Sequence, residues 1–132
     1  MTDILVPISP GELLDKITIL RIKSARMSDA TKVANVRLEL SLLEKTWRDA
    51  VGGAADVADV ADEERALQAV NERLWVIEDD IRDKERAQAF DARFIELARA
   101  VYVENDERAQ IKKRVNTLLG SSIVEEKSYQ QY

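Results

Sequence analysis

The sequence contains neither cysteine nor histidine, and these two absences exclude several classes of function. Without cysteine, the chain has no disulfides and no thiolate metal sites. Without histidine, it lacks the imidazole used in Ser-His-Asp and Cys-His catalysis, in zinc sites built on imidazole and in histidine proton switches. Any acid–base chemistry must therefore use Asp, Glu, Lys or Tyr side chains.

Strongly basic faces and long apolar runs are also missing. The net charge is -5, and residues 56–64 carry five acids and no base, so the rest of the chain is close to neutral. Nucleic-acid binding is therefore not expected. No apolar run approaches the ~20 residues that span a bilayer. The first residues, MTDILVPISPGE, lack the basic start and long apolar core of a signal peptide. We expect a cytoplasmic protein with no membrane partner and no cofactor.

The apolar residues recur at spacings of three and four, which is typical of amphipathic helices. The 132 residues fit a single domain. We predict an all-α fold, an antiparallel bundle of four long helices with short extended N- and C-terminal arms. The helices are expected over residues 10–27, 30–51 and 62–88 and from about residue 90 onward, with an acidic loop or frayed lead-in over residues 52–62.

The first helix has a clear start signal and an unusual distribution of apolar residues. Ser9, Pro10 and Glu12 fit a capping box, with Ser9 as the N-cap and Glu12 reaching back to it. Apolar residues lie on several sides of this helix, so it must be central in the bundle or buried by a second subunit. We favour the second interpretation and predict a homodimer through this helix.

The segment Asn71–Arg82, NERLWVIEDDIR, combines a tryptophan with several charges beside an apolar seam. Trp75 is expected to be buried in the core. At 100° per residue, Glu78 and Arg82 border the seam. Their simplest interpretation is an i,i+4 ion pair on the rim of the bundle.

The fourth helix has two possible forms. If it is continuous, Asn105, Arg108 and Lys112 fall on its buried line. The alternative is a break at Asn105-Asp106, because both are good N-cap residues, followed by a short fifth helix. The sequence does not decide between these two forms.

A continuous fourth helix would let five polar residues meet at the seam between the third and fourth helices. We predict a ligand-binding set of Glu78, Arg82, Asn105, Arg108 and Lys112, with a phosphate or carboxylate as the ligand. The competing interpretation is a closed structural network in which Glu78 pairs with Arg108 or Lys112 and no ligand enters.

Two pairs of carboxylates suggest a different function. Glu12 and Asp15 give an ExxD spacing, and Glu104 and Glu107 give ExxE. Such spacings hold Mg²⁺ in all-helical nucleotide pyrophosphohydrolases, although there the two motifs occur in the opposite order. The alternative function is therefore a small Mg-dependent hydrolase of a nucleotide or nucleotide-sugar. A further alternative is a pocket like that of chorismate mutase, in which Arg and Lys from several helices surround a dicarboxylate. Only the analogy between small helical bundles supports it.

Four segments resemble a known family: SPGELLDKITILRIK, LWVIEDDIR, FDARFIELARAVYVENDERAQIKKRVN and SIVEEKSYQQY. They are similar to small bacterial all-helical proteins labelled only as a domain of unknown function. The resemblance covers nearly the whole chain except residues 51–62, and it implies a helical fold and a bacterial origin without an activity. We favour a non-catalytic homodimeric binding or scaffold module that recognises a partner or a small anionic ligand.

Overall fold

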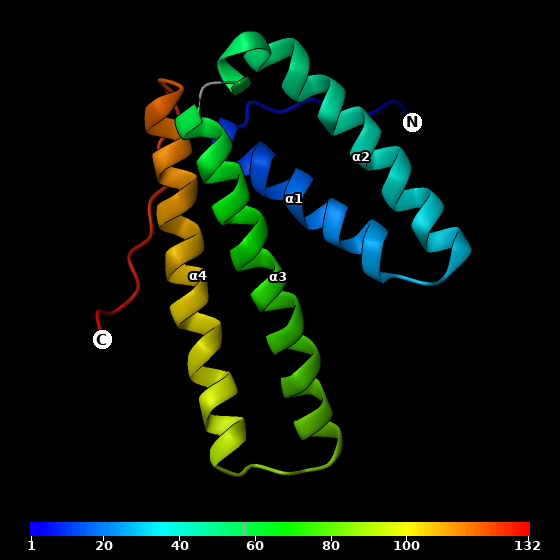
Figure 1. The fold of residues 1–132 in the computed structure, drawn as a ribbon, viewed down its shortest axis with the longest axis vertical. Coiled ribbons are helices and arrows are strands. Elements are labelled where there is room, and N and C mark those ends of the chain that lie inside the picture. Colours follow the sequence, from blue (N-terminus) through cyan, green and yellow to red (C-terminus); the bar gives the residue numbers. More distant parts are fainter. Residues whose placement is uncertain (57) are drawn as a thin grey trace.

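The computed structural model describes residues 1–56 and 58–132. These residues form four long helices and one short 3-10 helix, and they contain no strand. The all-α bundle is therefore confirmed (Figure 1). None of the helices in the described residues is both long and apolar enough to cross a membrane. The elements are α1 (Pro10–Arg26), α2 (Ala30–Val51), η1 (Gly52–Asp56), α3 (Ala58–Arg86) and α4 (Ala92–Leu118).

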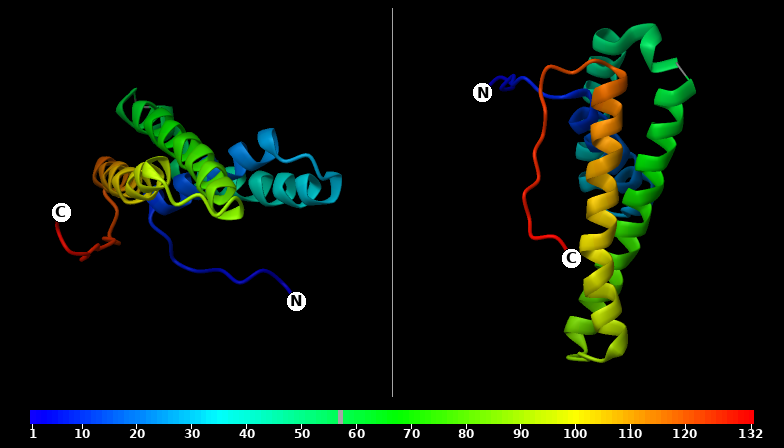
Figure 2. Two further views of the ribbon diagram at one scale, coloured as in Figure 1. Left: turned by 90° about the horizontal axis from the view of Figure 1, so that it is seen from below. Right: turned by 90° about the vertical axis from the view of Figure 1, so that its left-hand side faces the viewer.

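The helices form two hairpins of different length. Helix α1 packs against α2, and it also contacts both α3 and α4, which run side by side. The α3–α4 hairpin extends well beyond the end of α1, as Figures 1 and 2 show. We call residues 75–103, which lie in this extension, the distal hairpin.

The hydrophobic core is built around α1. Leu14 and Ile17 of α1 are fully buried against Leu67 of α3 and Ile111 of α4. The apolar faces of α1 are thus filled within one chain, and this helix is central in the bundle. The homodimer stays a prediction. The apolar surface of α1 that favoured a dimer through this helix is instead buried within the chain.

The start of α1 follows one half of the expected capping box. Ser9 is the N-cap, and its hydroxyl accepts a hydrogen bond of 3.2 Å from the Glu12 backbone N–H. The other half of the prediction is wrong, because the Glu12 carboxylate turns to Lys112 of α4. The residue that was expected to close the cap therefore connects two helices instead.

Helix α4 is continuous, so the predicted alternative of a break at Asn105-Asp106 is wrong. The Asn105 side chain donates to the Val101 carbonyl of the same helix, at 2.9 Å, instead of capping a new one. The helix begins two residues later than expected, after Asp91. The Asp91 carboxylate caps it by accepting from the Phe94 backbone N–H at 3.0 Å.

The acidic stretch before α3 is helical wherever the structure describes it. Residues 52–56 form η1, and α3 begins at Ala58, four residues before the expected start at Asp62. The interpretation of this stretch as a lead-in to the helix is therefore better than that of a loop. Val57 lies outside the described residues.

The tryptophan of the core is Trp47 of α2, which is 7% exposed. Trp75 is only half-buried, so the prediction of a buried ring there is wrong. Trp75 lies where the distal hairpin begins, beside the end of α1. Arg26 at that end pairs with Glu72, one turn before Trp75.

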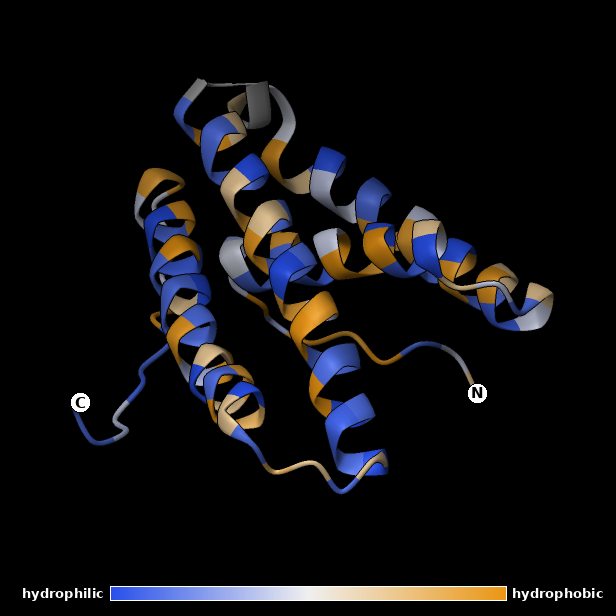
Figure 3. Ribbon diagram, turned by 60° about the horizontal axis from the view of Figure 1, so that its bottom comes forward, coloured by the Kyte–Doolittle hydropathy of each residue, from blue (hydrophilic) through white to orange (hydrophobic). Residues whose placement is uncertain are grey.

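Both ends of the chain are extended and lie outside the helices. The N-terminal arm exposes Ile4, Leu5 and Val6, and Figure 3 shows this apolar segment running away from the helices. We call residues 121–132 the strap. It turns back at the end of α4 and runs alongside that helix (Figure 2). The strap is thus anchored on α4, with one further contact from Glu125 to Ser9 at the start of α1.

Candidate functional site: a polar cluster between α1, α4 and the strap

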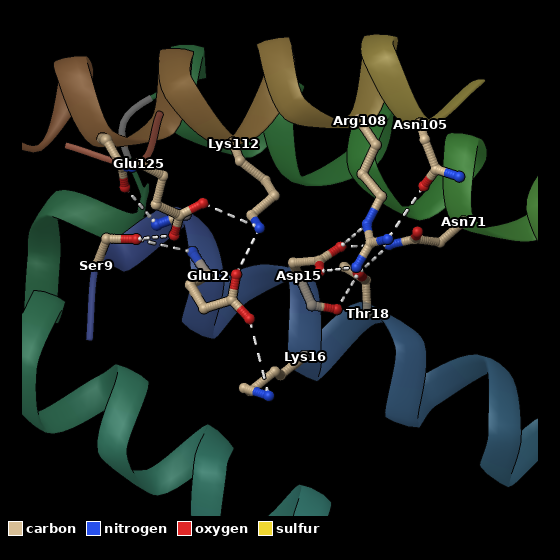
Figure 4. A network of polar contacts seen from close by, with 12 residues as sticks. Ser9, Glu12, Asp15, Lys16, Thr18, Asn71, Asn105, Arg108, Lys112 and Glu125 are labelled. Atoms are coloured by element: carbon tan, nitrogen blue, oxygen red, sulfur yellow. Dashed lines mark hydrogen bonds and ion pairs between the residues drawn. The ribbon is translucent and has the colours of Figure 1, made fainter. Parts of the chain in front are cut away.

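Polar side chains from parts of the sequence that lie far apart meet between α1 and α4 (Figure 4). Those on α1 and α4 recur every three or four residues, so each helix presents its set on one face. The strap and α3 add one residue each. We call this set the α1–α4 polar cluster. It consists of Ser9, Glu12, Asp15 and Thr18 of α1 and its cap, Asn71 of α3, Asn105, Arg108, Lys112 and Asn116 of α4, and Glu125 of the strap.

A glycine lets the start of α1 approach α4 closely. The Gly11 backbone N–H donates to the Asn116 side-chain oxygen at 2.6 Å. A Cβ atom at Gly11 would lie 2.8 Å from that oxygen and closer still to the Lys112 carbonyl. Only glycine fits here without a shift, and this contact brings Ser9 and Glu12 within reach of Lys112.

The inner half of the cluster is a closed ion pair. Asp15 is 1% exposed, and Arg108 donates hydrogen bonds to both of its carboxylate oxygens, with Nε at 2.9 Å from Oδ1. The Asn71 amide donates to Asp15 Oδ1 at 2.9 Å and to the Thr18 hydroxyl at 3.0 Å. The hydrogen bond to Asp15 raises the pKa of Arg108, so the guanidinium stays charged. These polar groups hydrogen-bond to one another, so the inner half of the cluster holds α1, α3 and α4 together.

The outer half of the cluster surrounds Lys112, whose side chain is 14% exposed. Its ammonium contacts Glu12 and also lies 3.1 Å from an oxygen of Glu125. Burial alone would lower the pKa of Lys112, but the hydrogen bonds to these two carboxylates raise it above its ordinary value. The lysine is therefore a fixed positive charge.

The Glu125 carboxylate occupies an anion site made by the rest of the chain. The Ser9 hydroxyl, in a residue that is 2% exposed, donates to one carboxylate oxygen at 2.8 Å, and Lys112 holds the other. Ser9 is also the N-cap of α1, so the carboxylate lies at the positive end of that helix. A hydroxyl, an ammonium and a helix terminus together suit any carboxylate or phosphate.

The rest of the strap is fastened by exposed polar contacts. Lys127 and the Tyr132 hydroxyl both contact Asp106, the latter at 2.6 Å, and the Tyr132 ring meets the Tyr102 ring edge-on. Between the strap and α4 lies a cleft of about 400 Å³. Its lining includes Glu125 and Lys113. The strap therefore covers a hollow next to the anion site.

The structure brings together three of the five predicted ligand-binding residues. Asn105, Arg108 and Lys112 share one face of α4, but Arg108 and Lys112 pair with α1 and not with α3, and Asn105 accepts from Arg108. Glu78 and Arg82 pair with each other on the surface of α3, as the rim interpretation expected. The predicted network of Glu78 with Arg108 or Lys112 is therefore wrong. Ligand binding by the five residues stays a prediction.

The carboxylate pairs proposed for Mg²⁺ are arranged around the chain's own cations. Glu12 and Asp15 contact the two α4 cations of the cluster. Glu104 and Glu107 both contact Arg73 of α3, at 2.9 and 3.3 Å. A divalent cation at either pair would have to replace an existing positive charge. This arrangement gives the hydrolase alternative no support.

Several residues of the cluster were not among those predicted from the sequence. Asp15 and Thr18 follow Glu12 at intervals of three within an otherwise apolar face of α1, and this spacing was an available signal. Asn71 begins the segment Asn71–Arg82, but nothing in that segment indicates its hydrogen bond to Asp15. Nothing local in the strap indicates that Glu125 meets Ser9, because 116 positions separate them.

Comparison with known proteins gives a family and no activity. No curated protein and no solved structure matches the chain. The model of the DUF6165 family, described as a family of unknown function, matches residues 4–132, and the chain therefore belongs to that family.

Proposed function

We propose that this protein is a non-catalytic binding module for a small anionic ligand. The ligand takes the place of the Glu125 carboxylate between Ser9 and Lys112. One observation carries the proposal: the chain's own carboxylate sits in a site built from a buried hydroxyl, a largely buried ammonium and a helix N-terminus. The strap is then a tethered competitor that the ligand displaces.

The contacts of the strap make such an exchange feasible. Every residue of the strap is exposed except Ser121. The pair of Lys127 with Asp106 is partly exposed, and exposed pairs contribute little to stability. The Glu125 carboxylate is itself partly exposed, although its partner Lys112 is largely buried. The inner pair of Asp15 and Arg108 does not depend on the strap, so the frame of the site survives when the strap leaves.

The donors define the class of ligand. Lys112 and Ser9 offer a charged and a neutral donor to the same anion, which fits a carboxylate or a phosphate group. Lys113 lines the adjoining cleft and offers a second positive charge to a dianion. A small molecule carrying a phosphate or two carboxylates is therefore the expected ligand.

Titration calorimetry with inorganic phosphate tests the proposal on the full chain. We compare the wild type with Glu125→Gln, which removes the internal anion. If the docked strap blocks the site about nine-tenths of the time, removing its charge should tighten phosphate binding roughly tenfold. Lys112→Met should abolish binding in both backgrounds.

Two neighbouring substitutions serve as matched controls. Glu126→Gln changes the charge of the strap one residue away, and Lys113→Met removes the next lysine of α4. Glu126→Gln should leave phosphate binding at the wild-type level, and Lys113→Met should weaken it only partly. Equal binding by wild type and Lys112→Met would overturn the proposal, as would silence of both wild type and Glu125→Gln.

A further inference from the structure

We propose that the distal hairpin is the interface of a homodimer. The two copies meet about a twofold axis, through the face of the hairpin that lies beyond the end of α1. This surface is separate from the anion site. The inference keeps the predicted dimer but moves it away from α1, whose apolar residues are already covered.

The hydrophobic core stops where the distal hairpin begins. Among residues 75–103, all of which the structure describes, only Leu97 is buried. The hairpin nevertheless carries apolar residues along its seam, and these are half-buried. They are Trp75, Ile77, Ile81, Phe94, Ala98 and Val101. A two-helix hairpin with such a seam lacks the further layer that helical domains use to bury it.

The uncovered face can be identified from the contacts of α1. We call the part of α3 and α4 outside the distal hairpin the proximal half. There α1 meets the sides of α3 and α4 that carry Asn71 and Arg108. On α3, steps of three and four residues carry the Asn71 side on to Trp75, Glu78 and Arg82.

The same side of α4 continues toward the loop through apolar residues. From Arg108, steps of three and four residues lead through Asn105 to Val101, Ala98 and Phe94. Helix α1 ends at Arg26, and the hairpin projects beyond it (Figure 1). The face that α1 covers in the proximal half is therefore without a covering helix in the distal half.

The charges on this face favour a second copy of the chain as the occupant. Glu78 and Arg82 lie one turn apart on α3 and carry opposite charges. A twofold axis between them places Glu78 of one copy opposite Arg82 of the partner subunit, and the reverse. The apolar stripe on α4 meets the same stripe of the other copy. The face is thus complementary to itself.

The size of the face predicts the strength of the dimer. Two helical segments of about 12 residues present a face roughly 18 Å long and 20 Å wide, or roughly 360 Å² when projected flat. Interfaces of this class fall in the small range, below about 1,200 Å² of total buried surface, and are typically reversible. The dimer should therefore dissociate on dilution.

Sedimentation equilibrium of the full chain over a range of micromolar concentrations tests the inference. The chain has a mass of 15.0 kDa, and the apparent mass should rise toward twice that value with concentration. Glu78→Arg or Arg82→Glu alone should weaken the dimer at least tenfold, because like charges then face each other. The double swap should restore it.

An equivalent pair on α2 provides the control for the charge swap. Lys45 and Asp49 form an exposed i,i+4 pair there, and the same single and double swaps should leave the dimer unchanged. Val101→Asp should give a monomer, whereas Val103→Asp, on the other side of α4, should not. If Val101→Asp unfolds, the charge swaps at the exposed pair still decide.

Three outcomes would overturn the inference. The first is a mass of one chain at all concentrations. The second is a dimer that tolerates Glu78→Arg and Arg82→Glu. The third is a dimer weakened by both single swaps that the double swap does not restore.

Discussion

Asp15 and Arg108 lie 93 positions apart in the sequence, yet they form a two-point ion pair between the central helix and α4. Asp15 directly follows Leu14 in α1, and both side chains are buried. The Asn71 amide donates to Asp15 Oδ1 and to the Thr18 hydroxyl, which in turn donates to the Asp15 backbone carbonyl. This pair fixes α4 against α1 and so positions Lys112, one turn further along α4.

Removing the buried carboxylate should destabilise the fold strongly. Asp15→Ala leaves the Arg108 guanidinium partly buried and unpaired, which costs about 3–5 kcal/mol of unfolding free energy. The double variant Asp15→Leu with Arg108→Met should recover much of this loss, since it removes both charges. Urea denaturation measures the effect, and Asp49→Ala, in an exposed pair, should leave stability unchanged. An Asp15→Ala protein as stable as wild type would refute this assignment.

A methyl group at Gly11 should loosen the contact of α1 with α4. Replacing a glycine by alanine normally stabilises a helix by about 0.5–1 kcal/mol. At Gly11, however, the new Cβ would clash with the backbone of α4, and such overpacking costs about 1–3 kcal/mol of unfolding free energy. The net effect should be a lower melting temperature. Gly53→Ala, where a Cβ meets nothing within 4 Å, is the control. Gly11→Ala with a raised melting temperature would contradict the close approach.

Docking of the strap should depend on pH at both extremes. The hydrogen bond from Lys127, followed by that from Tyr132, lowers the pKa of Asp106, so this contact is present above the ordinary Asp pKa and is lost as the pH falls through the lowered value. The hydrogen bond to Asp106 raises the pKa of Tyr132, so its contribution is present below the ordinary Tyr pKa and is lost as the pH rises through the raised value. Docking should thus be complete between about pH 4 and about pH 10.

The backbone order parameters of residues 123–132, measured by NMR relaxation, report this profile. Asp106→Asn removes the carboxylate and should reduce the loss of order at the acid end. Asp83→Asn, in a pair confined to α3, should leave the profile as in wild type. A strap whose order does not respond to Asp106→Asn would show that this residue does not fasten it.

The two tryptophans should differ in their effect on stability. Trp47 is buried in the core cluster, so Trp47→Ala should cost about 3–5 kcal/mol. Trp75 is half-buried, so Trp75→Ala should cost roughly half as much. Chemical denaturation of both variants gives the comparison. A larger loss for Trp75→Ala would reverse the assignment of the core.

The sequence predicts the helices well because their signals are local. The cap at Ser9 marks the start of α1, and the expected ranges 10–27 and 30–51 agree with α1 and α2 to within one residue. The cap at Asp91 is not predicted from the sequence, and α4 begins two residues later than expected. Turns and caps depend on a few neighbouring residues, so they can be predicted from the sequence alone.

The candidate site was only half predictable, because its partners are distant in sequence. Periodicity placed Asn105, Arg108 and Lys112 on one face of α4, as observed. Periodicity does not indicate which helix that face meets, and Arg108 and Lys112 pair with α1 instead of the expected α3. The spacing of Glu12 and Asp15 fits a cap and a Mg²⁺ pair, but in the structure these acids neutralise the two cations of α4.

The most direct test of the anion site is the order of the strap backbone, measured by NMR relaxation in the full chain while phosphate is added. If phosphate takes the place of the Glu125 carboxylate, the order parameters of residues 123–132 should fall as phosphate binds, and Lys112→Met should remove the response. If phosphate binds while the strap keeps its order, or the strap opens equally in Lys112→Met, the anion site is not where Glu125 sits.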